Sequence, residues 1–104
     1  MNYENINPEE FANLMDKEDH IVLDVRGADE LVEGSIDGYQ MINMFDVSFK
    51  SEIEKLDQSK SYLVYCRSGN RSGSACGFMS SLGFENLYNL SGGIIAWNRS
   101  TIAT

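Results

Sequence analysis

The fold is decided by the stretch Tyr62-Leu63-Val64-Tyr65-Cys66-Arg67-Ser68-Gly69-Asn70-Arg71-Ser72. Its first four residues form a short apolar run, which is typical of a strand buried on both faces of a parallel sheet. The run leads directly into Cys66 and a polar turn. A helix is predicted over 72–82, ended by Gly83. The sequence therefore predicts a strand, a loop and a helix, with a cysteine where the strand ends.

Segments of strand and helix type alternate on both sides of this unit. A buried strand is predicted over 20–25, a further strand over 86–90, and weaker strands over 3–6 and 40–44. Helices are predicted to start with the capping pattern at 7–10, to span 28–33 and 45–56, and to follow Gly92 and Gly93. This alternation implies an α/β fold, a parallel sheet with helices on both faces. Ligands bind such sheets at the carboxyl ends of the strands, which makes Cys66 a site candidate.

Length and composition restrict the classes of function. The 104 residues suggest one domain over 1–104, and the net charge of −8 argues against nucleic acid or a membrane surface as a partner. No apolar run approaches the roughly 20 residues of a membrane span, and no signal peptide is recognised, so a cytoplasmic location is expected. The two cysteines and His20 do not form a zinc pattern, and in a reducing compartment a disulfide is not expected.

The loop after Cys66 carries the features of an anion site. Its small central residues allow a tight turn, in which Gly69 is free to adopt positive φ. Such a turn directs backbone N–H groups inward at a helix N-terminus, and two arginines add positive charge. These features favour the thiolate, so we expect the pKa of Cys66 to lie below the free value of about 8.5. The candidate loop residues are Arg67, Ser68, Gly69, Asn70, Arg71 and Ser72.

The alternative for Cys66 is a buried structural cysteine. A lone cysteine is often buried in a core. The polar and basic residues that follow Cys66 are unsuited to a core position, so the sequence favours a reactive thiol.

Three stretches resemble the signatures of the rhodanese family, and together they span nearly the whole chain. They are Leu23-Asp24-Val25-Arg26 with Glu30 and Gly34, then Tyr65 through Ser72, then Leu90-Ser91-Gly92-Gly93-Ile94-Ile95-Ala96-Trp97. The resemblance implies a single rhodanese domain with a five-stranded parallel sheet, no metal and no organic cofactor.

The resemblance also implies a reaction. Cys66 would take sulfane sulfur from a small anionic donor such as thiosulfate, or from a persulfide, and would hold it as a persulfide. A thiophilic acceptor (cyanide, a thiol or a protein) would then remove the sulfur, in a double displacement with ping-pong kinetics. Arg67 and Arg71 are expected to orient the donor, since a guanidinium can make two parallel bonds to an oxyanion. A monomer is expected at this size.

Some residues depart from the family pattern or lie outside the loop. Ser35 and Met41 stand where the family usually has His and Asn. Asp24 and Arg26 follow a strand end, and we interpret them as a structural ion pair that supports the Cys66 loop. Cys76 is expected to pack in the core rather than to serve as a resolving thiol.

Two other functions compete with this interpretation. Phosphatases also use Cys and Arg in a loop, but they place five residues between the two, whereas four separate Cys66 from Arg71. A shorter loop suits a sulfur atom better than a phosphoryl group. The second alternative is a sulfur carrier or regulatory module that receives sulfur from a dedicated protein donor and has little activity with thiosulfate.

Overall fold

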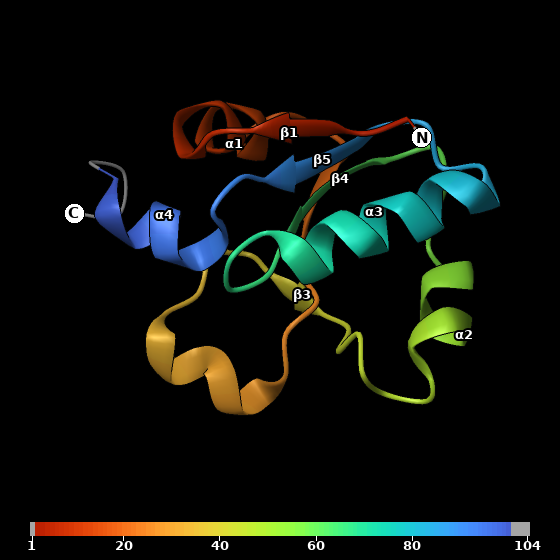
Figure 1. The fold of residues 1–104 in the computed structure, drawn as a ribbon. Helices are drawn as coiled ribbons and strands as arrows, with labels where there is room; N and C mark the ends of the chain where they lie inside the picture. Colours follow the sequence, from red (N-terminus) through yellow and green to blue (C-terminus); the bar gives the residue numbers. More distant parts are fainter. Residues whose placement is uncertain (1, 101–104) are drawn as a thin grey trace.

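The structure, a computed structural model, describes residues 2–100. Its elements are β1 (Glu4–Ile6), α1 (Pro8–Met15), β2 (His20–Asp24), the 3-10 helix η1 (Ala28–Glu33), β3 (Gln40–Met41), α2 (Phe49–Glu54), β4 (Ser61–Tyr65), α3 (Asn70–Leu82), β5 (Leu87–Leu90) and α4 (Gly93–Arg99). The five strands form one parallel sheet in the order β1-β5-β4-β2-β3 (Figure 1). The predicted five-stranded parallel sheet is confirmed.

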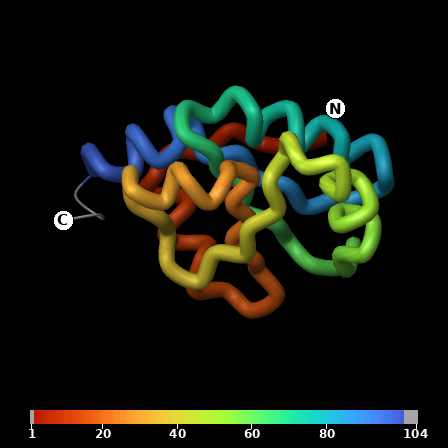
Figure 2. Tube along the Cα trace, turned by 90° about the horizontal axis from the view of Figure 1, so that it is seen from below, coloured from red at the N-terminus to blue at the C-terminus, as the bar shows by residue number. Residues whose placement is uncertain are grey.

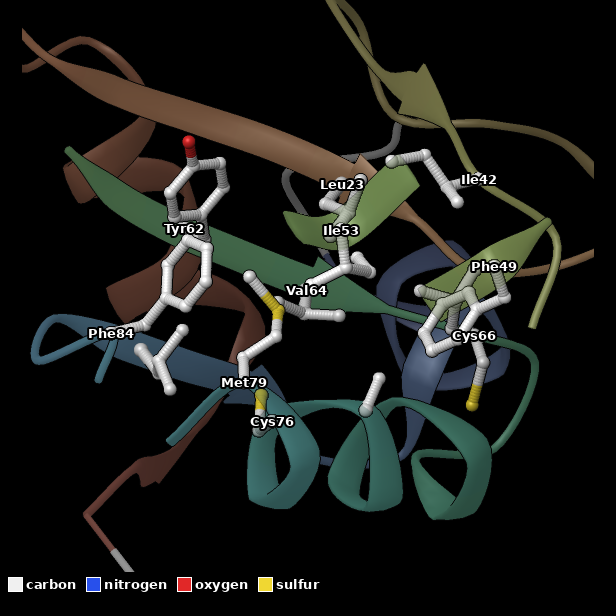
Figure 3. Close-up of a cluster of buried hydrophobic side chains, with 13 residues drawn as sticks. Leu23, Ile42, Phe49, Ile53, Tyr62, Val64, Cys66, Cys76, Met79 and Phe84 are labelled. Carbon is white, nitrogen blue, oxygen red and sulfur yellow. The ribbon is translucent and has the colours of Figure 1, made fainter. Parts of the chain in front are cut away.

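Helices cover both faces of the sheet, as the alternation of segments predicts. On one face, α2 and α3 contribute Phe49, Ile53 and Met79 to an apolar cluster (Figure 3). On the other face, a second cluster contains Phe11 of α1 and Trp97 of α4. The central strand β4 is buried on both sides, because its side chains alternate between the two clusters. Its carboxyl end is therefore held rigidly where Cys66 begins the loop.

A capping box and a left-handed glycine explain where α1 and α3 begin. Asn7 caps α1: its side chain accepts from the Glu10 N–H at 2.9 Å, and the Glu10 side chain accepts from the Asn7 N–H. This confirms the predicted capping box. Helix α3 begins at Asn70 rather than at Ser72, because Gly69 takes a left-handed conformation with φ +103° and starts the helix inside the loop.

The helix predicted over 45–56 is wrong in its first part. Helix α2 starts only at Phe49, and Phe45 is 76% exposed. The preceding segment forms turns instead, in which the Asn43 side chain accepts from the Phe45 N–H and the Asp46 N–H donates to the Asn43 carbonyl. Asparagine and aspartate stabilise such turns through side-chain hydrogen bonds, and this local chemistry overrides the helical spacing of Phe45.

The short helix predicted over 28–33 is confirmed in its bounds, and the predicted strand over 40–44 is shorter than expected. The segment 28–33 is a 3-10 helix, and β3 comprises only Gln40–Met41 of the predicted 40–44. The segment η1 follows the carboxyl end of β2, and β3 pairs with the last two residues of that strand. In Figure 2, η1 (orange) runs alongside the start of α3 (turquoise), so η1 forms one wall beside the Cys66 loop.

Candidate active site

The Cys66 sulfur lies inside a ring of hydrogen-bond donors from its own loop. Sγ accepts from the N–H of Gly69 at 3.1 Å, the N–H of Ser72 at 3.4 Å and the hydroxyl of Ser72 at 3.3 Å. Cys66 is only 1% exposed, and Figure 3 shows its sulfur directed toward the first turn of α3. The inward N–H groups predicted from the sequence are present in this arrangement.

The surroundings of the sulfur favour its ionised form. Burial raises the pKa of Cys66, because it penalises the charged thiolate. The Ser72 hydroxyl and the backbone N–H groups of Ser72, Gly69 and Ser68 act in the opposite direction and outweigh burial. The net effect is a pKa below the ordinary value for a thiol, as the sequence predicts.

Helix α4 supports the loop from behind. The N–H groups of Ile94 and Ile95 donate to the carbonyls of Cys66 at 2.9 Å and Arg67 at 3.2 Å. The backbone approach at Gly93 is so close that a Cβ there would lie 2.3 Å from the Arg67 carbonyl oxygen. With their carbonyls bonded to α4, the peptide groups around Cys66 keep their N–H groups free to face the sulfur.

Both loop arginines are bound by carboxylates of η1, which the sequence analysis did not anticipate. Arg71 makes two parallel bonds to Glu30, at 2.8 and 2.7 Å, through both of its terminal nitrogens. Arg67 contacts Glu33 through Nε alone, at 3.0 and 3.1 Å. Within residues 2–100, the terminal nitrogens of Arg67 make no hydrogen bond. The loop therefore carries less free positive charge than two unpaired arginines would give.

The ion pair expected from Asp24 and Arg26 is formed, and both side chains are fully buried. Arg26 donates to Asp24 at 2.8 Å and also to the carbonyls of Glu30 at 3.1 Å and Gly34 at 2.8 Å. These bonds hold the middle and the C-terminal end of η1. The pair thus supports the Cys66 loop indirectly, by positioning the helix that carries Glu30 and Glu33.

One buried polar residue next to the loop escaped the sequence analysis. Asn89 of β5 is 5% exposed, accepts from the Ser72 hydroxyl, and donates to the Gly69 carbonyl at 3.2 Å and to Asn5 at 2.9 Å. The available signal was an asparagine within the apolar run 87–90, because a buried polar side chain requires partners.

The remaining candidates lie apart from the sulfur. Cys76 is fully buried in α3, and burial raises its pKa to about 12, in agreement with the predicted core role. Ser68 and Asn70 are exposed at the outer side of the loop, Ser35 is exposed before Ile36, and Met41 is half-buried in β3. Over residues 2–100, no cluster of three or more His, Cys, Asp or Glu side chains could hold a metal, and none of the described helices could cross a membrane.

Comparisons with known proteins agree with this geometry. The family model for the rhodanese-like domain matches residues 7–100. A sulfurtransferase from Allochromatium vinosum is 38% identical over 87 residues, which cover 83% of this chain and 78% of the relative. The thiosulfate sulfurtransferase GlpE of Pseudoalteromonas translucida is 27% identical over 97 residues, covering 93% and 90%. The crystal structure of a rhodanese-related protein from Thermoplasma volcanium matches with a TM-score of 0.80 at 33% identity, covering 93% and 92%.

Proposed function

Because this chain belongs to the rhodanese-like domain family, we propose that it moves sulfane sulfur from thiosulfate or a persulfide donor to a thiophilic acceptor through a persulfide on Cys66. Relatives named sulfurtransferases support a general sulfurtransferase role. The observation that carries the proposal for Cys66 is the set of three donors, from Gly69 and Ser72, that converge on its sulfur.

The reaction balances as two displacements at sulfur. In the first, the Cys66 thiolate attacks the outer sulfur of thiosulfate, the S–S bond of the donor breaks, and sulfite leaves with the electron pair. Cys66 then carries a persulfide anion, whose negative charge lies on the outer sulfur. In the second, a nucleophile such as cyanide attacks that outer sulfur and leaves as thiocyanate, and the thiolate is restored. N–H groups directed into the loop stabilise the anions in both steps.

The two arginines differ in what they offer an anionic donor. Arg71 uses both terminal nitrogens for Glu30, whereas Arg67 is anchored through Nε and is half exposed. We assign donor binding to the terminal nitrogens of Arg67, and to Arg71 the role of tying α3 to η1. A planar guanidinium fixed at Nε presents two parallel N–H groups to an oxyanion.

The same ion pairs favour a second candidate function. Glu30 and Glu33 compensate the charge of both arginines, which weakens the attraction of a doubly charged donor. This observation supports a carrier that receives sulfur from a protein persulfide and uses thiosulfate poorly. Both candidate functions use a persulfide on Cys66. They differ in the sulfur donor, which is thiosulfate or a small persulfide in the first and a protein persulfide in the second.

Intact-mass measurement with a panel of donors tests the proposal. Native protein incubated with thiosulfate should gain the mass of one sulfur atom, which cyanide should remove. Cys66→Ser should gain nothing, and Cys76→Ala, which removes the other cysteine, should behave like the native protein. A gain only with a protein or low-molecular-weight persulfide would favour the carrier. No gain with any donor, or efficient hydrolysis of an aryl phosphate, would refute the proposal.

A further inference from the structure

The Ser72 hydroxyl lies within hydrogen-bonding distance of two acceptors, the Cys66 sulfur and the Asn89 amide oxygen, but it has one proton to donate. Its oxygen lies 3.3 Å from Cys66 Sγ and 2.5 Å from Asn89 Oδ1. A serine hydroxyl carries a single hydrogen, so it donates to one of these atoms at a time. Ser72, Cys66 and Asn89 are all buried. The proton is therefore shared within the protein interior.

The orientation of the Asn89 amide is fixed by its other contacts. Its Nδ2 donates to the carbonyl oxygen of Gly69 at 3.2 Å and to Asn5 Oδ1 at 2.9 Å. The Gly69 carbonyl can only accept a hydrogen bond, so the nitrogen of the amide must face it. The amide oxygen then faces Ser72. Asn89 is consequently a true acceptor that holds the Ser72 proton.

Whether Cys66 is a thiol or a thiolate decides which of the two acceptors receives the Ser72 hydrogen bond. While Cys66 is a neutral thiol, the Ser72 hydroxyl can donate to Asn89 and accept weakly from the S–H group. When the sulfur becomes a thiolate, it is the stronger acceptor, because hydrogen bonds to charged groups are roughly twice as strong as neutral ones. The hydroxyl must then leave Asn89 to serve the sulfur, and the Asn89 oxygen loses its partner. Ionisation of Cys66 therefore costs one buried hydrogen bond.

We propose that Asn89 is a positioning residue for sulfur transfer: it holds the Ser72 hydroxyl proton while the sulfur is neutral and yields it when the sulfur is ionised. The proposal rests on the proposed function only in taking Cys66 as the reacting thiol. Asn89 makes the resting cysteine less reactive than its ring of donors would otherwise allow. The backbone N–H groups of Gly69 and Ser72 have no competing acceptor of this kind, so they face the sulfur in both of its states.

Other charged and titratable groups also act on the sulfur. From α3, the Arg71 guanidinium and the buried Cys76 thiol interact with Cys66 electrostatically. Glu30 of η1 lies behind Arg71, and Arg67 lies in the loop next to Glu33. These groups are the same in each variant considered below, so their influence cancels when the variants are compared.

The first test is the pKa of Cys66, measured from the pH dependence of its alkylation by iodoacetamide. Asn89→Leu removes the competing acceptor at similar volume, so the pKa should fall by about 0.5 to 1 unit. A purely structural role predicts the opposite sign, because loss of the bond to the Gly69 carbonyl would loosen the donors around the sulfur. An unchanged or raised pKa would overturn the proposal.

A double-mutant cycle and a matched control isolate the shared proton. In a Ser72→Ala background, which lacks the hydroxyl, Asn89→Leu should leave the Cys66 pKa unchanged. A fall that persists in this background would also overturn the proposal. Asn5→Ala is the control, since Asn5 contacts the Asn89 amide but not Ser72. It should leave the Cys66 pKa at the native value.

A measurement on the native protein covers the case in which Asn89→Leu does not fold. The side-chain carbonyl carbon of Asn89 should change its NMR chemical shift with the midpoint of the Cys66 titration, because it loses a donor as the thiolate forms. This change should be strongly reduced in Ser72→Ala, and an Asn89 resonance that does not titrate in the native protein would be contrary evidence. Neither measurement uses a sulfur donor, so both remain decisive if sulfur transfer itself is not observed.

Discussion

Glu30 and Arg71, 41 positions apart in the sequence, are joined by two parallel hydrogen bonds of 2.8 and 2.7 Å. This pair connects η1 to the first turn of α3, so it links the wall beside the loop to the helix that carries Ser72. Both side chains are largely shielded from water, which makes the pair stronger than an exposed one.

Because of the Glu30–Arg71 pair, the free energy of unfolding should decrease as the pH falls into the acid range. Arg71 lowers the pKa of Glu30 to about 2, below the ordinary value of 4.5. The stabilisation is therefore fully present above pH 4.5 and is lost as the pH falls toward 2. Glu30→Gln should lower the free energy of unfolding at pH 7 by about 1 kcal/mol, allowing for partial solvation, and the difference from native protein should shrink toward pH 2. Urea unfolding at several pH values measures both effects.

Glu52→Gln is the matched control for this prediction. Glu52 and Lys55 form an exposed ion pair within one helix end, and exposed pairs contribute little. Its unfolding free energy should equal that of the native protein. If Glu30→Gln were equally neutral, the η1–α3 pair would not stabilise the fold.

Arg67 and Arg71 should differ in their effect on donor choice. Arg67→Ala removes the exposed terminal nitrogens and should raise the KM for the doubly charged thiosulfate by about 3- to 10-fold, with a smaller change for a singly charged thiosulfonate anion, which leaves as a sulfinate. Arg71→Ala should reduce activity with both donors and lower the stability, because it leaves Glu30 unpaired. Steady-state kinetics with the two donors makes the comparison. Equal losses for both donors in Arg67→Ala would show that Arg67 does not bind the anion.

The close approach at Gly93 should be intolerant of a methyl group. Gly93→Ala places a Cβ 2.3 Å from the Arg67 carbonyl oxygen at a residue with φ +57°. It should cost about 3 kcal/mol or more of stability and slow alkylation of Cys66. Gly38→Ala is the control, since Gly38 has φ +79° but no atom within 4 Å of its Cβ position. It should cost only the left-handed strain of about 1 kcal/mol. Equal costs would mean that the loop adapts to the methyl group.

The two cysteines should react very differently. Cys76 is fully buried, and burial raises its pKa to about 12, whereas the pKa of Cys66 is lowered. Native protein at pH 8 should therefore take up one alkyl group from iodoacetamide, and unfolded protein should take up two. Native Cys66→Ser should take up none. Two groups on the native protein, read by intact mass, would contradict the core assignment of Cys76.

The elements with strong patterns could be predicted from sequence, and so could the cysteine. The buried strand before Cys66 and the capping box at Asn7 rest on local signals that tertiary packing did not change. The helix prediction for the segment around Phe45 was wrong because Asn43 and Asp46 form turns there, although the apolar residues have a helical spacing. Spacing alone does not distinguish an apolar side chain that packs from one that remains exposed.

The residues that bind the Cys66 loop could not be predicted from sequence patterns, because they lie on other helices and strands that are distant in the sequence. Glu33 binds Arg67 from η1, and Asn89 reaches Ser72 from β5. The loop motif shows that two arginines and a serine are present, but their free charge and free protons depend on these distant residues. The charge of the site was therefore overestimated from the motif.

The hydrogen bonds from Ile94 and Ile95 to the carbonyls of Cys66 and Arg67 have a consequence for biosynthesis. These bonds form between residues that leave the ribosome at different times, with Cys66 first. A nascent chain therefore carries Cys66 as an ordinary thiol until the segment up to Ile95 has emerged and α4 has docked. The loop around the sulfur is thus completed only after the segment up to Ile95 has been synthesised, which is later than the synthesis of Cys66 itself.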